Sequence, residues 1–235
     1  MINYVSQLHP FYETVAPALD IDSLFEVTEG VAHVVAAQPL ERIYEVMGSF
    51  CRPIAARIVA LQHKDGAADE KDYRKVAGNS VLRGILTLDD IELLTIFVQT
   101  VSPYVERQQE HPAVQLLMEL WPALSVTLDV FGSIQYVSES VSKCFKNLIY
   151  SYRIHTLPLL GPMAEKLVAA FERYEYGCFL WVSGAIVRQF GHEEVEDDVR
   201  RAIWLFVERQ CVNTFRLLEN NQPNDIPDCI APNSP

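Results

Sequence analysis

The sequence predicts an all-α protein, an α-solenoid built from HEAT-type antiparallel helix pairs. Apolar residues recur at helical spacing along most of the chain, and no convincing run of strand alternation occurs. Prolines and short polar breaks divide this pattern into about nine helical segments in series, more than a four-helix bundle contains. The later helix pairs start at intervals close to the roughly 40–47 residues of HEAT and armadillo units. We therefore expect a solenoid block at residues 1–220 and a polar tail without fixed structure at residues 221–235.

Local signals mark the ends of the predicted helices. Asp20 or Asp22 can cap the second helix, and Gln38–Pro39 ends it. Asp89 and Asp90 suit an N-terminal helical turn, where the helix dipole favours negative charge. The predicted helices cover residues 2–19 with a possible break at His9–Pro10, 20–37, 40–62 with a bend at Pro53, 71–86 and 89–101 as one broken helix or two, 111–128, 133–153, 157–173, 177–190 and 193–219.

The helix from His111 to Leu128 is the most distinctive of these segments. Pro112 fits its first turn, where a missing N–H has no effect, and Pro122 should kink it. Apolar residues fill both sides of Pro122, so we expect this helix to pack among others. Four aromatic side chains should be buried between helices: Trp121, Phe145, Phe179 and Phe206.

Composition excludes several classes of function. The 235 residues carry a net charge of −12 and a pI of about 4.9. A direct nucleic-acid binder would need a basic surface, whereas an acidic chain attracts basic protein partners. The longest apolar run, Gly177 to Val187, is shorter than a bilayer span, so we expect no membrane insertion. No basic segment of a signal peptide precedes Pro10.

Catalytic and metal-binding patterns are also missing from the sequence. The five cysteines form no C-x-x-C pair, the six histidines form no H-E-x-x-H motif, and no glycine-rich phosphate loop occurs. Ser140 to Lys143 reads as S-x-x-K, but the motifs that accompany it in penicillin-binding enzymes are absent. We therefore expect no enzymatic activity, no cofactor and no metal.

The helix at Ser133–Arg153 has two contrasting sides. Ile134, Val137, Val141, Phe145, Leu148 and Tyr152 form an apolar side. The opposite side is net positive in a strongly acidic chain, which indicates either an ordinary solvated face or a binding surface. It consists of Tyr136, Glu139, Ser140, Lys143, Lys146, Asn147, Tyr150 and Arg153.

An acidic run precedes the last predicted helix. Negative charge at a helix start is favoured by the dipole, so the run can be a solvated terminus. The other interpretation is a contact for a basic partner. The residues are Glu193, Glu194, Glu196, Asp197 and Asp198.

Three groups of residues carry a family resemblance. The first is His111–Pro112 followed by Trp121–Pro122, Leu124–Ser125 and Thr127–Leu128. The second is Cys178–Phe179–Leu180 with Ser183 and Phe190–Gly191, and the third is Thr214–Phe215 with Leu217–Leu218–Glu219. With these motifs in this order, the chain resembles transportin-SR, a family of importin-β-type karyopherins. The resemblance runs from the first helix to about Asp228 and covers a central-to-late block of HEAT repeats.

The resemblance implies part of a nuclear import receptor that moves cargo through the nuclear pore under the control of the GTPase Ran. The implied cargo is an RS/SR-type splicing factor or another Arg-rich RNA-binding protein. Nucleoporins are the other implied partners, and the implied location is both cytoplasm and nucleus. A helical-repeat scaffold with no transport role is the alternative.

The resemblance also implies a cargo site on the helix at Ser133–Arg153. In the family, the corresponding helix carries an arginine row that binds RS domains, including their phosphoserines. Lysine cannot offer the bidentate fork of arginine, so a cargo less dependent on phosphorylation is expected. The acidic run would then contact basic cargo or Ran. The implied cargo positions are Tyr136, Ser140, Lys143, Lys146, Tyr150 and Arg153.

Overall fold

The computed structural model describes residues 4–62, 88–191 and 195–220. Of these residues 87% are helical, and none lies in a strand, which confirms the all-α prediction. The chain divides into two compact units, Met1–Thr127 and Leu128–Pro235, and the boundary falls within helix α5. The helix predicted at residues 71–86 and the tail predicted at residues 221–235 lie outside the described residues, so both stay predictions.

Unit 1 contains helices whose ends follow from the sequence. Asp20 caps α2 by accepting a hydrogen bond from the backbone N–H of Ser23 at 3.0 Å. Helix α1 continues through Pro10, so no break occurs at His9–Pro10. The elements of this unit are α1 (Tyr4–Val15), η1 (Ala16–Ala18), α2 (Ile21–Ala36), α3 (Leu40–Gln62), a helical segment at 88–100 and most of α5 (Pro112–Phe131).

Aromatic packing connects three helical segments in the core of unit 1. Phe50 of α3 stacks on Phe97 with ring centroids 5.8 Å apart, and Tyr12 of α1 meets Phe50 edge-on at 5.5 Å. The buried hydroxyl of Tyr12 has a partner, because it lies 2.8 Å from Thr28 Oγ1 of α2. Gln62 ties the end of α3 to α5 by donating to the Ala123 carbonyl at 2.7 Å.

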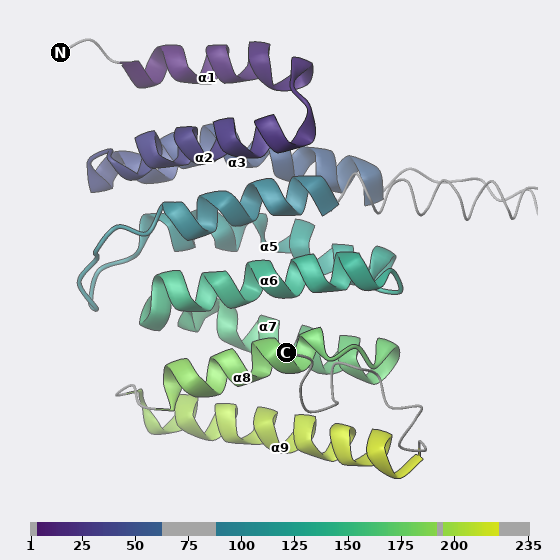
Figure 1. The fold of residues 1–235 in the computed structure, drawn as a ribbon. Coiled ribbons are helices and arrows are strands. Elements are labelled where there is room, and N and C mark those ends of the chain that lie inside the picture. Colours follow the sequence, from purple (N-terminus) through teal and green to yellow (C-terminus); the bar gives the residue numbers. More distant parts are fainter. Residues whose placement is uncertain (1–3, 63–87, 192–194, 221–235) are drawn as a thin grey trace, which may run out of the picture. The chain divides into compact units, whose positions relative to one another are not determined.

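Unit 2 contains the helices in which the candidate site lies. Helix α6 packs along α8, while α7 contacts both α8 and α9 (Figure 1). Tyr176 donates to the Ser133 carbonyl near the start of α6 and α8, and Arg188 donates to Tyr150 near their ends. The two helices therefore run parallel, and α7 is the segment of the chain that connects them. The elements are α6 (Gln135–Tyr152), η3 (Arg153–Thr156), α7 (Leu157–Tyr174), α8 (Cys178–Phe190) and α9 (Asp197–Asn220).

Three of the four aromatic side chains predicted to be buried lie in the core. Phe145 and Phe179 have no exposed surface, and Phe206 is 7% exposed. The prediction for Trp121 is wrong, because this side chain of α5 is only partly buried. The large indole is seldom covered completely, and here exposed Glu119 and Pro122 lie beside it in the chain.

Polar contacts join α9 to α7 and α8. Asn213 Nδ2 donates to Glu172 Oε1 of α7 at 3.0 Å, and Gln210 Nε2 donates to Ser183 Oγ of α8 at 3.1 Å. All these contacts lie on the buried side of α9, together with Leu217.

Helix α5 is long and apolar enough, by length and composition, to cross a membrane. Half of its most apolar window is buried against other parts of the protein. Core helices of helical arrays have the same composition, because neighbours cover them on several sides.

Truncation of Phe145 tests the apolar side of α6. We expect Phe145→Ala to lower the free energy of unfolding by about 3–5 kcal/mol, because it leaves a cavity where the ring is fully enclosed. Denaturant unfolding followed by circular dichroism measures this change. The control is Phe215→Ala on α9, where the ring is 63% exposed and the expected loss is about 0.5 kcal/mol. Equal midpoints for wild type and Phe145→Ala would contradict the assignment.

Candidate functional site

A row of long side chains lies on the solvent-facing side of α6. Tyr136 is 72% exposed, Tyr150 is 37% exposed, Lys143 is exposed and Lys146 is half-buried. They are separated by seven, three and four positions, which places all of them on one side of the helix. We call these four residues the α6 stripe. Four of the six cargo positions that the family resemblance implies thus reach the surface together.

The other two implied positions depart from this row. The prediction that Ser140 lies on the exposed side is wrong, since the residue is only 7% exposed. The buried arc of α6 is therefore wider than the helical wheel assigned. Helix α6 ends at Tyr152, and Arg153 has φ 48° and ψ −122°, outside the helical region. Arg153 is exposed but does not continue the α6 stripe.

Helix α8 adds two side chains to this surface that the sequence interpretation missed. Arg188 donates to the hydroxyl of Tyr150 through Nε at 3.2 Å and through Nη2 at 3.1 Å. Trp181, two helical turns earlier, is 49% exposed. In the sequence, Arg188 marked only the end of an apolar run. The available signal was the spacing of Trp181, Gly184 and Arg188, which places them on one side of the helix.

The acidic run is described only in part. Glu196, Asp197 and Asp198 are exposed, and the last two form the first turn of α9 as predicted. Asp198 Oδ1 accepts from the backbone N–H of Val199 at 2.8 Å, so it serves the helix start. Glu193 and Glu194 lie outside the described residues.

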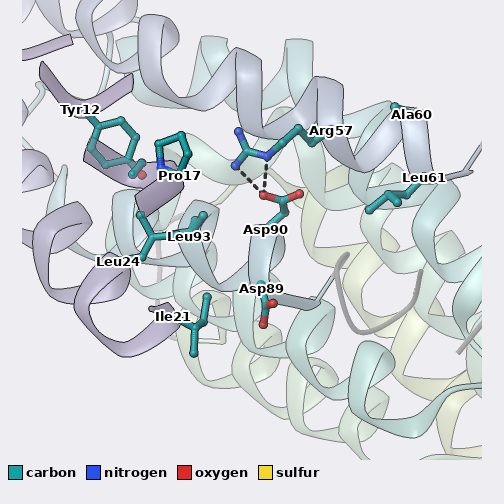
Figure 2. A pocket seen from close by; sticks show the side chains of 11 residues that line it. Tyr12, Pro17, Ile21, Leu24, Arg57, Ala60, Leu61, Asp89, Asp90 and Leu93 are labelled. Atoms are coloured by element: carbon teal, nitrogen blue, oxygen red, sulfur yellow. Dashed lines mark hydrogen bonds and ion pairs between the residues drawn. The ribbon is translucent and has the colours of Figure 1, made fainter. Parts of the chain in front are cut away.

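Unit 1 holds a pocket of about 530 Å³ between η1, α2, α3 and the segment at 88–100 (Figure 2). Its walls are mainly apolar, as in many small-ligand sites. At its edge, Arg57 donates to Asp90 Oδ1 through Nε at 2.9 Å and Nη2 at 2.6 Å (Figure 2). The sequence interpretation placed no site here. The lining residues are Tyr12, Ala16, Pro17, Ile21, Leu24, Arg57, Ala60, Leu61, Asp89, Asp90 and Leu93.

Burial governs the charges in this pocket. It raises the pKa of Asp90 above the ordinary aspartate value, although the ion pair with Arg57 acts in the opposite direction. Burial also raises the pKa of Asp89. The Asp90 carboxylate is therefore less stable in the folded chain than in water.

The carboxylate paired with a second arginine of α3 has a net pKa shift in the opposite direction to that of Asp90. Arg52 binds Glu119 of α5 bidentately, through Nε at 2.9 Å and Nη2 at 3.1 Å, and Tyr44 donates to the same carboxylate at 3.0 Å. The Arg52 guanidinium lowers the pKa of Glu119. This cluster balances its own charge.

Two kinds of site, a metal site and the nucleophile of the S-x-x-K sequence, are not supported in the described part of the chain. No group of three or more His, Cys, Asp or Glu side chains there could hold a metal ion. In the S-x-x-K sequence, Ser140 is buried while Lys143 is exposed, so the hydroxyl is not accessible to a substrate.

Comparisons with known proteins agree with the fold. A sequence model of the family described as "Transportin-3/Importin-13 fourth TPR domain" matches residues 111–218. The structure of "Importin13 cytosolic state" superposes with a TM-score of 0.70 over 93% of this chain and 24% of that one, at 14% identity. This likeness supports the α-solenoid fold of HEAT-type helix pairs.

Two curated relatives match nearly the whole chain. One is the Schizosaccharomyces pombe protein "Uncharacterized protein C11G11.07", 37% identical over 98% of this chain and 23% of its own length. The other is "mRNA transport regulator MTR10" of Saccharomyces cerevisiae, 24% identical over 98% of this chain and 24% of its own length. The chain thus spans about a quarter of the length of these relatives. Together the similarities support a relationship to the importin-β karyopherin superfamily.

Replacement of Asp90 tests the electrostatics of unit 1. A raised folded-state pKa means that the folded chain binds more protons than the unfolded chain above about pH 4, so stability falls as pH rises through this range. Asn at position 90 keeps an oxygen for Arg57 but carries no charge. We therefore expect Asp90→Asn to be as stable as wild type or more stable at pH 7, with the difference vanishing below pH 4. Thermal melts across this range measure it.

Glu119→Gln is the matched control, because the pKa of Glu119 is lowered whereas that of Asp90 is raised. The lowered pKa of Glu119 gives a stabilisation that is present above the ordinary glutamate value and is lost as pH falls. Its size is small, since the Glu119 side chain is 42% exposed. A loss of stability in Asp90→Asn at pH 7 that matches the loss in Glu119→Gln would contradict the assignment.

Proposed function

We propose that the chain is part of a nuclear import receptor of the importin-β karyopherin superfamily. The match of residues 111–218 to the Transportin-3/Importin-13 family supports this, because it covers α5 to α9. The relative named as an mRNA transport regulator supports a role in transport rather than in catalysis. In this proposal the chain has no enzymatic activity and acts by binding.

We propose further that the α6 stripe binds the cargo, an RS/SR-type splicing factor or another Arg-rich RNA-binding protein. The single observation that carries this is the surface row of two tyrosines and two lysines, of which Lys146 is half-buried, in a chain of net charge −12. Tyrosine rings can receive guanidinium groups of the cargo by cation–π contact. Lysines can pair with its phosphates or carboxylates.

Ran and nucleoporins are the other partners in this proposal, and the receptor moves between cytoplasm and nucleus. The exposed carboxylates of Glu196, Asp197 and Asp198 offer a contact for basic cargo or for Ran. Pulldown with Ran–GTP and with an SR-type protein tests these partnerships. Capture of neither would favour a helical-repeat scaffold with no transport role.

Removal of the two lysines tests the cargo surface. We expect Lys143→Ala combined with Lys146→Ala to weaken an RS peptide at least about tenfold, or ~1.4 kcal/mol, without unfolding the chain. Charge-assisted contacts to phosphate or carboxylate account for the loss, reduced by exposure and salt. Arginine at both positions should strengthen binding of the phosphorylated peptide more than of the unphosphorylated one. Fluorescence anisotropy at two salt concentrations measures these affinities.

The control removes two positive charges elsewhere in unit 2. Arg200→Ala with Arg201→Ala changes two exposed side chains of α9 and the net charge by the same amount. This variant should bind like wild type. If both double variants and wild type have the same affinity, the α6 stripe is an ordinary solvated face.

A further inference from the structure

Arg52 and Arg188 occupy similar local settings on α3 and α8. Each follows a glycine by four positions, Gly48 and Gly184, and folds back over it, as helical side chains do toward the N-terminus. A Cβ at Gly48 would overlap Arg52 Nη1, and a Cβ at Gly184 would lie 3.5 Å from Arg188 Nη1. Each arginine also directs its Nε and Nη2 at one group on a neighbouring helix.

The two arginines differ in the group that accepts the hydrogen bonds from Nε and Nη2. For Arg52 it is the Glu119 carboxylate, with a further hydrogen bond from Tyr44. For Arg188 it is the hydroxyl of Tyr150, which carries no charge, and within the described residues Arg188 forms no ion pair. Tyr150 accepts both hydrogen bonds, so its own hydroxyl hydrogen remains available to another acceptor.

We infer that Arg188 and Tyr150 form a binding site for a carboxylate side chain of a partner protein. An aspartate or glutamate of the partner would supply at Arg188 the negative charge that Glu119 supplies at Arg52. It would accept from the Arg188 guanidinium and from the Tyr150 hydroxyl, both in charge-assisted hydrogen bonds. Lys146, one helical turn before Tyr150, adds a second positive charge on the same side of α6.

The partner segment must be basic outside this acidic residue. A wholly acidic segment would be repelled by a chain of net charge −12. In an arginine-rich segment with a single acidic side chain, the arginines are attracted by the acidic chain at long range. The acidic side chain pairs with Arg188 on contact. This choice of segment rests on the proposed function, whereas the carboxylate chemistry rests on the geometry of Arg188 and Tyr150 alone.

Peptide binding tests the site directly. A labelled Arg-Ser repeat peptide with one central glutamate should bind wild type about threefold more tightly than the same peptide with glutamine. In Arg188→Met and in Tyr150→Phe this preference should disappear. The matched control is Arg201→Met, an exposed arginine of α9, which should keep it. A preference that survives in Arg188→Met would overturn the proposal. So would a phosphoserine peptide that binds more tightly than the glutamate peptide through Arg188, because the site would then be one for phosphate.

A second measurement does not depend on cargo. The NMR signal of the Arg188 Nε–H group, identified by its loss in Arg188→Met, should shift on titration with acetate more than the signals of exposed Arg200 and Arg201. An equal shift for all three would overturn the carboxylate site even if RS peptides bind. If no peptide binds while Arg188 responds selectively, the proposed cargo is wrong and the carboxylate site stands.

Discussion

The parallel packing of α6 along α8 is the constraint on which the candidate site depends. On the packed side of α6, Val141, Phe145 and Leu148 are completely or nearly completely buried, so the opposite side of α6 is the one open to binding. The same packing brings Tyr150 beside Arg188, residues 38 positions apart in the sequence. Side chains of two helices therefore form one surface, and any change that shifts one helix along the other would separate them.

Much of the helical layout could be predicted because burial repeats with the period of a helix. The bounds of α3, Leu40–Gln62, agree with the prediction to the residue, since a proline precedes this helix and its apolar spacing is regular. The apolar side of α6 was predicted for the same reason. Asp20 was recognisable as a cap because its carboxylate acts within one turn of its own helix.

The errors concern features that depend on neighbouring helices. Ser140 is buried, and no local pattern in the sequence shows how wide an arc of α6 its neighbours cover. Trp121 stays partly exposed because its neighbours do not cover the large indole completely. Arg188 was overlooked because its place in the candidate site depends on its hydrogen bond to Tyr150, which lies on another helix. The periodicity of apolar residues thus predicts which residues form a helix. Which side chains come together on one surface depends on how neighbouring helices are aligned along each other.

The hydrogen-bond partner of Arg188 differs from those of the paired cations in both units. Elsewhere in each unit the ion pairs are internal: Glu119 neutralises Arg52, and Asp129 neutralises Lys166 at 2.8 Å. The Arg188 guanidinium has instead a neutral hydroxyl as its partner. Screening in physiological salt limits charge effects to about 8 Å, so the acidic surface acts on a partner during approach and the local cations act after contact. A chain that attracts basic segments from a distance can therefore still select among them by the position of an acidic side chain.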